Sequence, residues 1–278
     1  MKFIEGLNRF ITTYISTLKG FIRPAVVFPL FLFFLIELGI LWILTNFYKA
    51  PLDNIMVPLL TRFFGENITH YPTLYYMVSS VFGYASLPLT FIFGTLLMGM
   101  SVFLFASFFS DEGLSIGAAF KATISKYPIL LLIWILETAI ILGTITIITR
   151  EFGAFFSFSL KREVMFRLVI TGGLQTLLAG FFAYANASVI LGRKSFGKAI
   201  FASMRMFKEN FFTTVFLIYI PVLIRFPMTF INSKSAQFSG KFNPEFVIVL
   251  MIISIFIALI ANLFLVGGIT RIYIAESR

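Results

Sequence analysis

Two acidic residues, Glu37 and Glu137, lie near the middle of long apolar segments, where a carboxyl group could bind a proton or a cation. Each is the only ionisable residue of its segment, 24–47 for Glu37 and 128–149 for Glu137. A charge at mid-bilayer costs at least ~2.5 kcal/mol, so a retained acid normally faces the interior of a helix bundle, neutral or paired. Two interpretations stay open: binding of a proton, cation or cationic substrate, and a structural hydrogen bond from a protonated carboxyl.

Three further polar residues fall within apolar segments. Arg225 is the only basic one, and because it lies toward the end of its segment, snorkelling of its side chain is favoured over pairing with an acid. Asn186 and Asn262 are expected to form hydrogen bonds between helices, each contributing ~1 kcal/mol.

Other reactive groups are sparse. The chain has no cysteine, which excludes disulfides, thiolate nucleophiles and Cys-ligated metals. The single histidine, His70, has only Glu66 and Asp53 near it in sequence. A metal site normally needs three or more protein ligands, and a serine hydrolase needs a base that an acid holds in place. We therefore predict no catalytic residue, no metal site and no cofactor.

The composition is that of a polytopic membrane protein. Of the 278 residues, 59% are hydrophobic and 12% charged, and the mean hydropathy is +0.97, outside the range of soluble domains. The formal charge of +10 is attributed to loops that face the cytoplasm and anionic headgroups. Binding of nucleic acid would need a soluble basic domain, which this sequence lacks.

The predicted fold is all-α with about six transmembrane helices. We place the spans at residues 24–47, 87–109, 128–149, 168–192, 211–231 and 246–270. The sequence leaves open whether 71–109 is one kinked helix or a span preceded by an interfacial or re-entrant piece, and 150–167 is predicted to be a charged loop.

Amphipathic segments are predicted to lie on the membrane surface. In the first twenty residues, eight apolar residues share one helical face: Phe3, Ile4, Leu7, Phe10, Ile11, Tyr14, Ile15 and Leu18. Polar residues that include Asn8, Thr12, Thr13 and Ser16 fill the other face, a pattern typical of an interfacial helix. A second surface helix, predicted to be external, is expected within residues 48–73.

A similar segment recurs at Ser115 and Ser195, where Ser, an apolar residue and Gly are followed by Ala and then by a span. We predict a single integral membrane domain, 1–278, built from three parallel repeats of one surface helix and two spans: 1–110, 111–194 and 195–278. The basic residues of the third repeat and of the turn before it are predicted to form a surface for lipid or a partner: Arg193, Lys194, Lys198, Arg205 and Lys208.

The distribution of charge predicts the orientation. With both termini inside, the cytoplasmic segments hold thirteen Lys and Arg and the opposite side eight, which with Arg225 accounts for all 22. This bias favours cytoplasmic termini in a cytoplasmic or inner membrane.

The pattern Gly197, Ala199, Ser203, Lys208, Asn210 and Phe211, running into a span, resembles the repeated unit of a loose group of prokaryotic six-helix membrane proteins. The group includes the membrane module fused to some glycerophosphodiester phosphodiesterases. The resemblance implies six-span topology and no catalytic residue.

The function expected from these features is non-enzymatic. The chain would act as a scaffold, assembly partner or membrane-organising factor, in which basic cytoplasmic helices bind anionic lipid headgroups, a protein partner or a second copy of the chain. The alternative is the membrane subunit of a transporter, with Glu37 and Glu137 lining a substrate or proton path.

Overall fold

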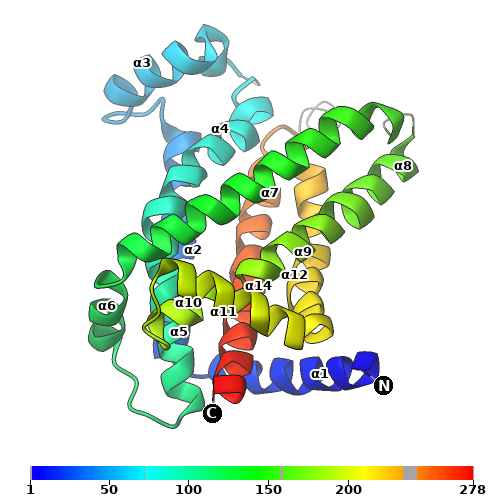
Figure 1. The fold of residues 1–278 in the computed structure, drawn as a ribbon. Coiled ribbons are helices and arrows are strands. Elements are labelled where there is room, and N and C mark those ends of the chain that lie inside the picture. Colours follow the sequence, from blue (N-terminus) through cyan, green and yellow to red (C-terminus); the bar gives the residue numbers. More distant parts are fainter. Residues whose placement is uncertain (1, 72, 157–158, 234–242, 278) are drawn as a thin grey trace. The chain divides into compact units, whose positions relative to one another are not determined.

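The computed structural model describes residues 2–71, 73–156, 159–233 and 243–277, and over these ranges the chain forms helices and no strand. The helices are α1 (Lys2–Gly20), α2 (Pro24–Asn46), α3 (Asp53–Phe64), η1 (Glu66–Thr69), α4 (Thr73–Leu89), η2 (Thr90–Gly94), α5 (Thr95–Phe109), α6 (Ile116–Ile124), α7 (Tyr127–Phe156), α8 (Leu160–Met165), η3 (Phe166–Thr171), α9 (Gly172–Phe182), α10 (Ala185–Ile190), α11 (Phe196–Glu209), α12 (Phe211–Ser233) and α14 (Phe246–Ser277) (Figure 1).

Six helical segments among the described residues are long and apolar enough to cross a membrane. They are Pro24–Asn46, Met77–Phe109, Tyr127–Phe152, Leu160–Ile190, Phe211–Ile231 and Phe246–Ser277. The predicted class, an all-α multi-pass membrane protein, is confirmed.

The second span has no break. Residues 77–109 form continuous helix in which Thr90–Gly94 make a π turn just after Pro88. A π turn leaves backbone carbonyls without their usual partners, and here the Tyr127 hydroxyl donates to the Ile92 carbonyl at 2.7 Å. The question left open by the sequence is therefore resolved in favour of one helix with a π turn.

The fourth span begins earlier than predicted. Residues 160–167, expected to be loop, are helical, because Ser159 caps α8 by accepting a hydrogen bond from the Arg162 amide at 3.3 Å. Glu163 and Arg167 add an ion pair at 3.0 Å along the helix. The prediction of a charged loop over these residues is wrong.

Contacts divide the chain into two compact units, each described by itself. The first unit comprises Met1–Leu30, Phe91–Ile224 and Ala261–Arg278, and the second comprises Phe31–Thr90 and Arg225–Ile260.

The second unit has its own apolar core, with residues from α2, α3, η1, α4 and α14 that include Phe47, Leu60, Ile68, Val78 and Met251. The predicted apolar face of α3 divides into two rows. Met56, Leu60 and Phe64 pack on this core, whereas Ile55, Leu59 and Phe63 are exposed.

In the first unit, the three helices predicted to lie on the membrane surface, α1, α6 and α11, pack closely against candidate spans at glycines. A β-carbon on Gly99 of α5 would lie 2.5 Å from Thr123 of α6. A β-carbon on Gly180 of α9 would collide with the Phe207 ring of α11, and one on Gly267 of α14 with Thr17 of α1. Each contact depends on the missing side chain, since it lets the two helices approach closely.

Candidate functional site

Helix α1, predicted to lie on the membrane surface, carries three rows of residues rather than two faces. The buried row contains small residues and one aromatic: Gly6, Phe10, Thr13, Thr17 and Gly20. The second row is apolar but exposed: Ile4, Ile11, Ile15 and Leu18. The third is polar and exposed: Glu5, Asn8, Thr12 and Lys19. Thr13, which the sequence placed on the polar face, is thus buried against the protein.

The buried row of α1 packs across the beginning of α12 and the C-terminal end of α14 (Figure 1). Thr213 donates to the Gly6 carbonyl at 3.3 Å. The Tyr14 ring stacks on Phe264 with ring centroids 3.9 Å apart, and burial raises the pKa of the Tyr14 hydroxyl. The docking row consists of small residues and Phe10, whereas Ile4, Ile11, Ile15 and Leu18 beside it stay exposed.

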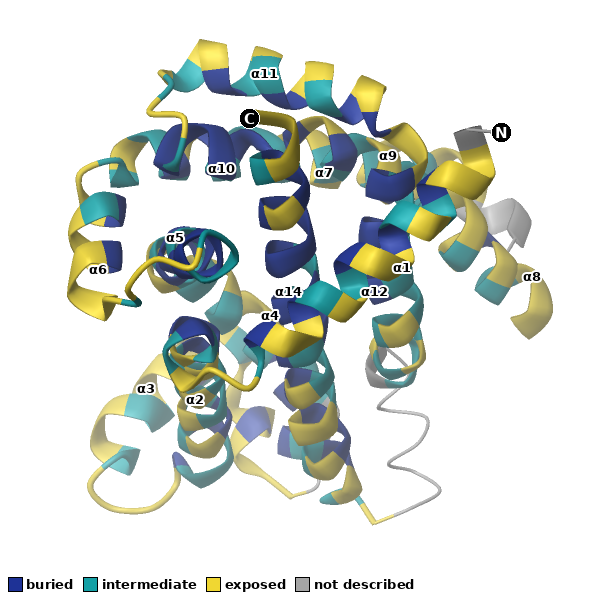
Figure 2. Ribbon diagram, turned by 90° about the horizontal axis from the view of Figure 1, so that it is seen from below, coloured by how far each residue is buried: buried dark blue, intermediate teal, exposed yellow. Residues whose placement is uncertain are grey.

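Helices α6 and α11 have the same three rows. Their buried residues are small or aromatic: Ala119 and Thr123 in α6, and Ala199, Ser203 and Phe207 in α11. Their exposed apolar residues are Ile116, Phe120 and Ile124 in α6, and Phe201 and Met204 in α11. Figure 2 shows both helices with their exposed residues turned away from α5 and α10.

The rows follow one another in the same rotational order in all three helices. At about 100° per residue, buried, exposed apolar and polar rows succeed each other with increasing angle in α1, α6 and α11. In α11 the polar row contains Lys198, Arg205 and Glu209, while exposed Lys208 falls between Met204 and Phe201 of the apolar row. In α6 the polar row contains Lys121.

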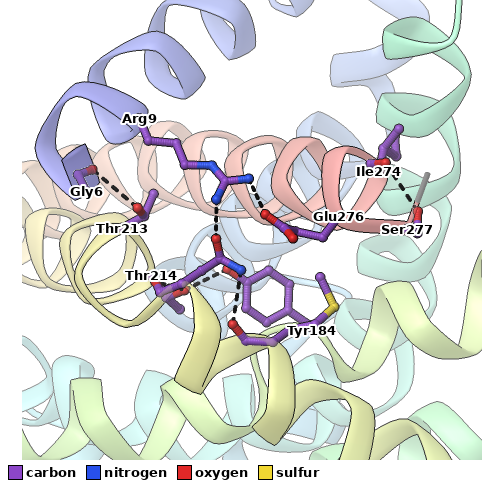
Figure 3. Close-up of polar contacts among 10 residues, drawn as sticks. Gly6, Arg9, Tyr184, Thr213, Thr214, Ile274, Glu276 and Ser277 are labelled. Atoms are coloured by element: carbon purple, nitrogen blue, oxygen red, sulfur yellow. Dashed lines mark hydrogen bonds and ion pairs between the residues drawn. The ribbon is translucent and has the colours of Figure 1, made fainter. Parts of the chain in front are cut away.

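A polar cluster joins α1, α12 and the end of α14 (Figure 3). The Arg9 guanidinium donates to Asn210 Oδ1 and to Glu276 Oε1. Asn210 is only 5% exposed, and its amide nitrogen donates to the Met206 carbonyl at 3.2 Å. The cluster therefore connects the first and last helices of the chain to the junction between α11 and α12.

Tyr184 extends this cluster, which lies within the first unit, to the turn between α9 and α10. The chain turns at Ala183 and Tyr184, between α9 and α10, and the Tyr184 amide donates to Ser203 Oγ of α11 at 3.0 Å. The Tyr184 hydroxyl and the Thr214 hydroxyl are 2.6 Å apart. Both Tyr184 and Ser203 are fully buried, so Ser203 fixes the turn to the surface helix.

Replacing Ser203 with alanine should destabilise the protein by about 1–3 kcal/mol, because the buried Tyr184 amide would lose its acceptor. Ser195, at the start of α11, is exposed and makes no capping bond, so Ser195→Ala should change the free energy of unfolding by less than about 0.5 kcal/mol. Thermal unfolding in detergent measures both. Equal effects of the two changes would contradict the role given to Ser203.

Of the polar residues predicted within spans, Glu37 and Arg225 come together. Both belong to the second unit, and they lie close enough for their charges to interact, although none of the ion pairs described in the structure joins them. The preference for snorkelling of Arg225 over pairing with an acid stays a prediction. Glu137 belongs to α7 in the first unit, so the structure does not bring the two acids together within one unit.

The two asparagines do not form the predicted bonds. Asn186 Oδ1 is buried without a hydrogen-bond partner. None of the hydrogen bonds described for this structure involves the side chain of Asn262, which lies half-buried in α14. Their contribution to helix association is therefore packing, as far as the described contacts go.

The predicted basic surface lies on α11 and the turn before it. Lys198, Arg205 and Lys208 are exposed, as is Arg193, while Lys194 is half-buried. Arg205 donates to Glu209 at 2.9 Å, an interaction that raises the pKa of the guanidinium.

No group of three or more His, Cys, Asp or Glu side chains within the described ranges could hold a metal ion. The polar features of this protein are thus the three-row helices and the Arg9 cluster, on an α-helical multi-pass membrane fold. No protein-family model matches the chain, and comparison with curated proteins and with solved structures also finds no match. The resemblance to the six-helix group stays a prediction.

Proposed function

We propose that this protein is a non-enzymatic membrane-organising scaffold that gathers anionic lipid around a frame of in-plane helices, α1, α6 and α11. The observation that carries the proposal is the division of each helix into three rows: one buried on the protein, one apolar and exposed, and one polar and exposed. A helix at the membrane interface has three neighbours, namely protein, hydrocarbon and water, and each row suits one of them.

The common rotational order of the rows supports a parallel repeat. Suppose that three helices lie in the membrane plane on the same side of the bilayer and run in the same direction around the protein. Going around each helix axis in one sense, the protein, the hydrocarbon and the water are then met in the same order. The glycine contacts also repeat: α5 contacts α6, α9 contacts α11, and α14 contacts α1. In each pair a span packs on the surface helix of the next repeat, and the last span packs on the surface helix of the first repeat. We infer that the helices lie on the cytoplasmic side, where anionic lipids attract basic residues.

Charge reversal on α11 tests the proposal. We expect the purified protein in mixed vesicles to enrich a fluorescent anionic lipid, measured by energy transfer from the protein. Lys198→Glu with Lys208→Glu should abolish the enrichment, because each basic residue near the surface contributes about 1 kcal/mol. The matched control is Arg62→Glu with Lys161→Glu, which changes the charge equally at exposed residues predicted to face the opposite side.

Equal loss in both double variants, or no enrichment by the unaltered protein, would contradict lipid organisation. The transport alternative would be supported instead if proteoliposomes showed a proton or cation flux that Glu137→Gln abolishes without a change in melting temperature. A protonated Glu and a Gln have nearly the same shape, so this substitution separates a titrating role from a structural one.

A further inference from the structure

A cavity of about 410 Å³ opens in the first unit between the end of α5, the turn after α10 and the end of α14. Its lining includes one carboxylate and several hydroxyls: Glu112, Ser107, Ser110, Tyr273 and Ser277. The volume lies within the range of sites that bind small molecules. In Figure 2 the C-terminal end of the chain lies next to α10.

The charged group of this cavity is negative. None of the described ion pairs involves Glu112, which is exposed and can serve a ligand. The helices α5 and α14 both end at the cavity, and the C-terminal end of a helix carries a partial negative charge. Three basic side chains lie near this region without lining the cavity: Arg271 packs on the Phe109 ring, Arg193 is exposed, and the stem of Lys194 lies beside Gly192 at the cavity's edge.

The hydroxyls provide neutral acceptors beside the carboxylate. Ser107 is only 4% exposed and lines the cavity, and no hydrogen bond described for the structure uses its side chain. The Ser107 hydroxyl is therefore open to a hydrogen bond with water or a ligand in the cavity.

We propose that this cavity binds a small aliphatic ammonium ligand from the aqueous side, with the Glu112 carboxylate as its counter-ion and the Ser107 and Ser110 hydroxyls as hydrogen-bond acceptors. The apolar side chains of Phe103, Leu191 and Ile274 in the lining suit the methylene groups of such a ligand. This site is separate from the lipid surface of α11, because none of the α11 residues lines it.

Titration calorimetry of the detergent-purified full chain with spermidine tests the site. We expect saturable binding of one spermidine per chain. Glu112→Gln, which keeps the shape and removes the charge, should weaken binding at least tenfold. Ser110→Trp should fill the cavity and abolish binding. The matched control is Glu5→Gln, which removes one negative charge from an exposed position of α1 and should leave the affinity within twofold.

Unsaturable heats with the unaltered protein would overturn the proposal. So would unchanged affinity in Glu112→Gln, or an equal loss in Glu5→Gln, since the latter would indicate general attraction to the protein's acids. Competition by inorganic phosphate for the same cavity would also overturn it. If Ser110→Trp does not fold, as judged from its melting temperature, Glu112→Gln and Glu5→Gln still decide the outcome.

Discussion

Replacing Gly180 with alanine should destabilise the protein by about 1–3 kcal/mol, whereas the same replacement at Gly173 in the same helix should stabilise it. Both glycines lie in α9. A β-carbon at Gly180 would collide with the Phe207 ring, with Cζ of that ring only 2.7 Å away, and overpacking of this kind costs about 1–3 kcal/mol. At Gly173 no atom lies within 4 Å of the added carbon, so the better helix propensity of alanine should contribute up to about 1 kcal/mol.

The pair of variants tests how α11 docks on the protein. Phe207 is buried, 4% exposed, and its ring also meets Phe181 edge-on with centroids 5.2 Å apart, so it cannot move away freely. Thermal unfolding in detergent gives the two free-energy changes. If Gly180→Ala stabilises the protein as Gly173→Ala does, the close contact between α9 and α11 is not present in solution.

The spans could be predicted from the sequence because long apolar runs have few alternative structures in a membrane protein. The start of the fourth span was missed because its first eight residues, 160–167, include four charged side chains. In this segment the cap that Ser159 provides and the ion pair between Glu163 and Arg167 stabilise the helix. A hydropathy pattern does not contain this information.

The three rows of α1 could be predicted only in part. Periodicity finds an apolar face, but it does not distinguish residues that face protein from residues that face lipid. Apart from Phe10, the protein-facing row of α1 is made of Thr13, Thr17 and two glycines, since short side chains let helices approach closely. A row of glycine and threonine beside an apolar face is therefore a better signal of docking than the apolar face itself.

The polar cluster was not predicted at all. Arg9 and Glu276 are 267 positions apart, and their pairing depends on the packing of α1 against α14. Asn210, which ends the repeated segment, was visible in the sequence as part of a pattern, but its partner Arg9 was not.

Placing aspartate at Ile11 and Ile15 of α1 should destabilise the protein in a bilayer by about 3–6 kcal/mol. These residues are 45% and 54% exposed in the protein, so a large part of each is available to the bilayer. Burial of an isoleucine side chain in hydrocarbon contributes about 1.5–3 kcal/mol, and aspartate loses it at each site. The control, Asn8→Asp with Thr12→Asp, adds the same charge to the exposed polar row of the same helix and should be tolerated.

Melting temperatures in lipid nanodiscs compare the stability of the two double variants with that of the unaltered protein.

The position of α1 relative to the bilayer can also be measured directly with single-cysteine labels, because the chain has no other cysteine. A fluorophore on a single cysteine at Ile15 should be quenched by lipids that carry a quencher in the upper acyl chain, and one on a cysteine at Thr12 should be quenched by an aqueous quencher. If both positions respond only to the aqueous quencher and the Ile11 and Ile15 changes are harmless, the apolar row does not face the bilayer. In that case α1 could not be part of an in-plane frame, and lipid gathering by such a frame would lose its physical basis.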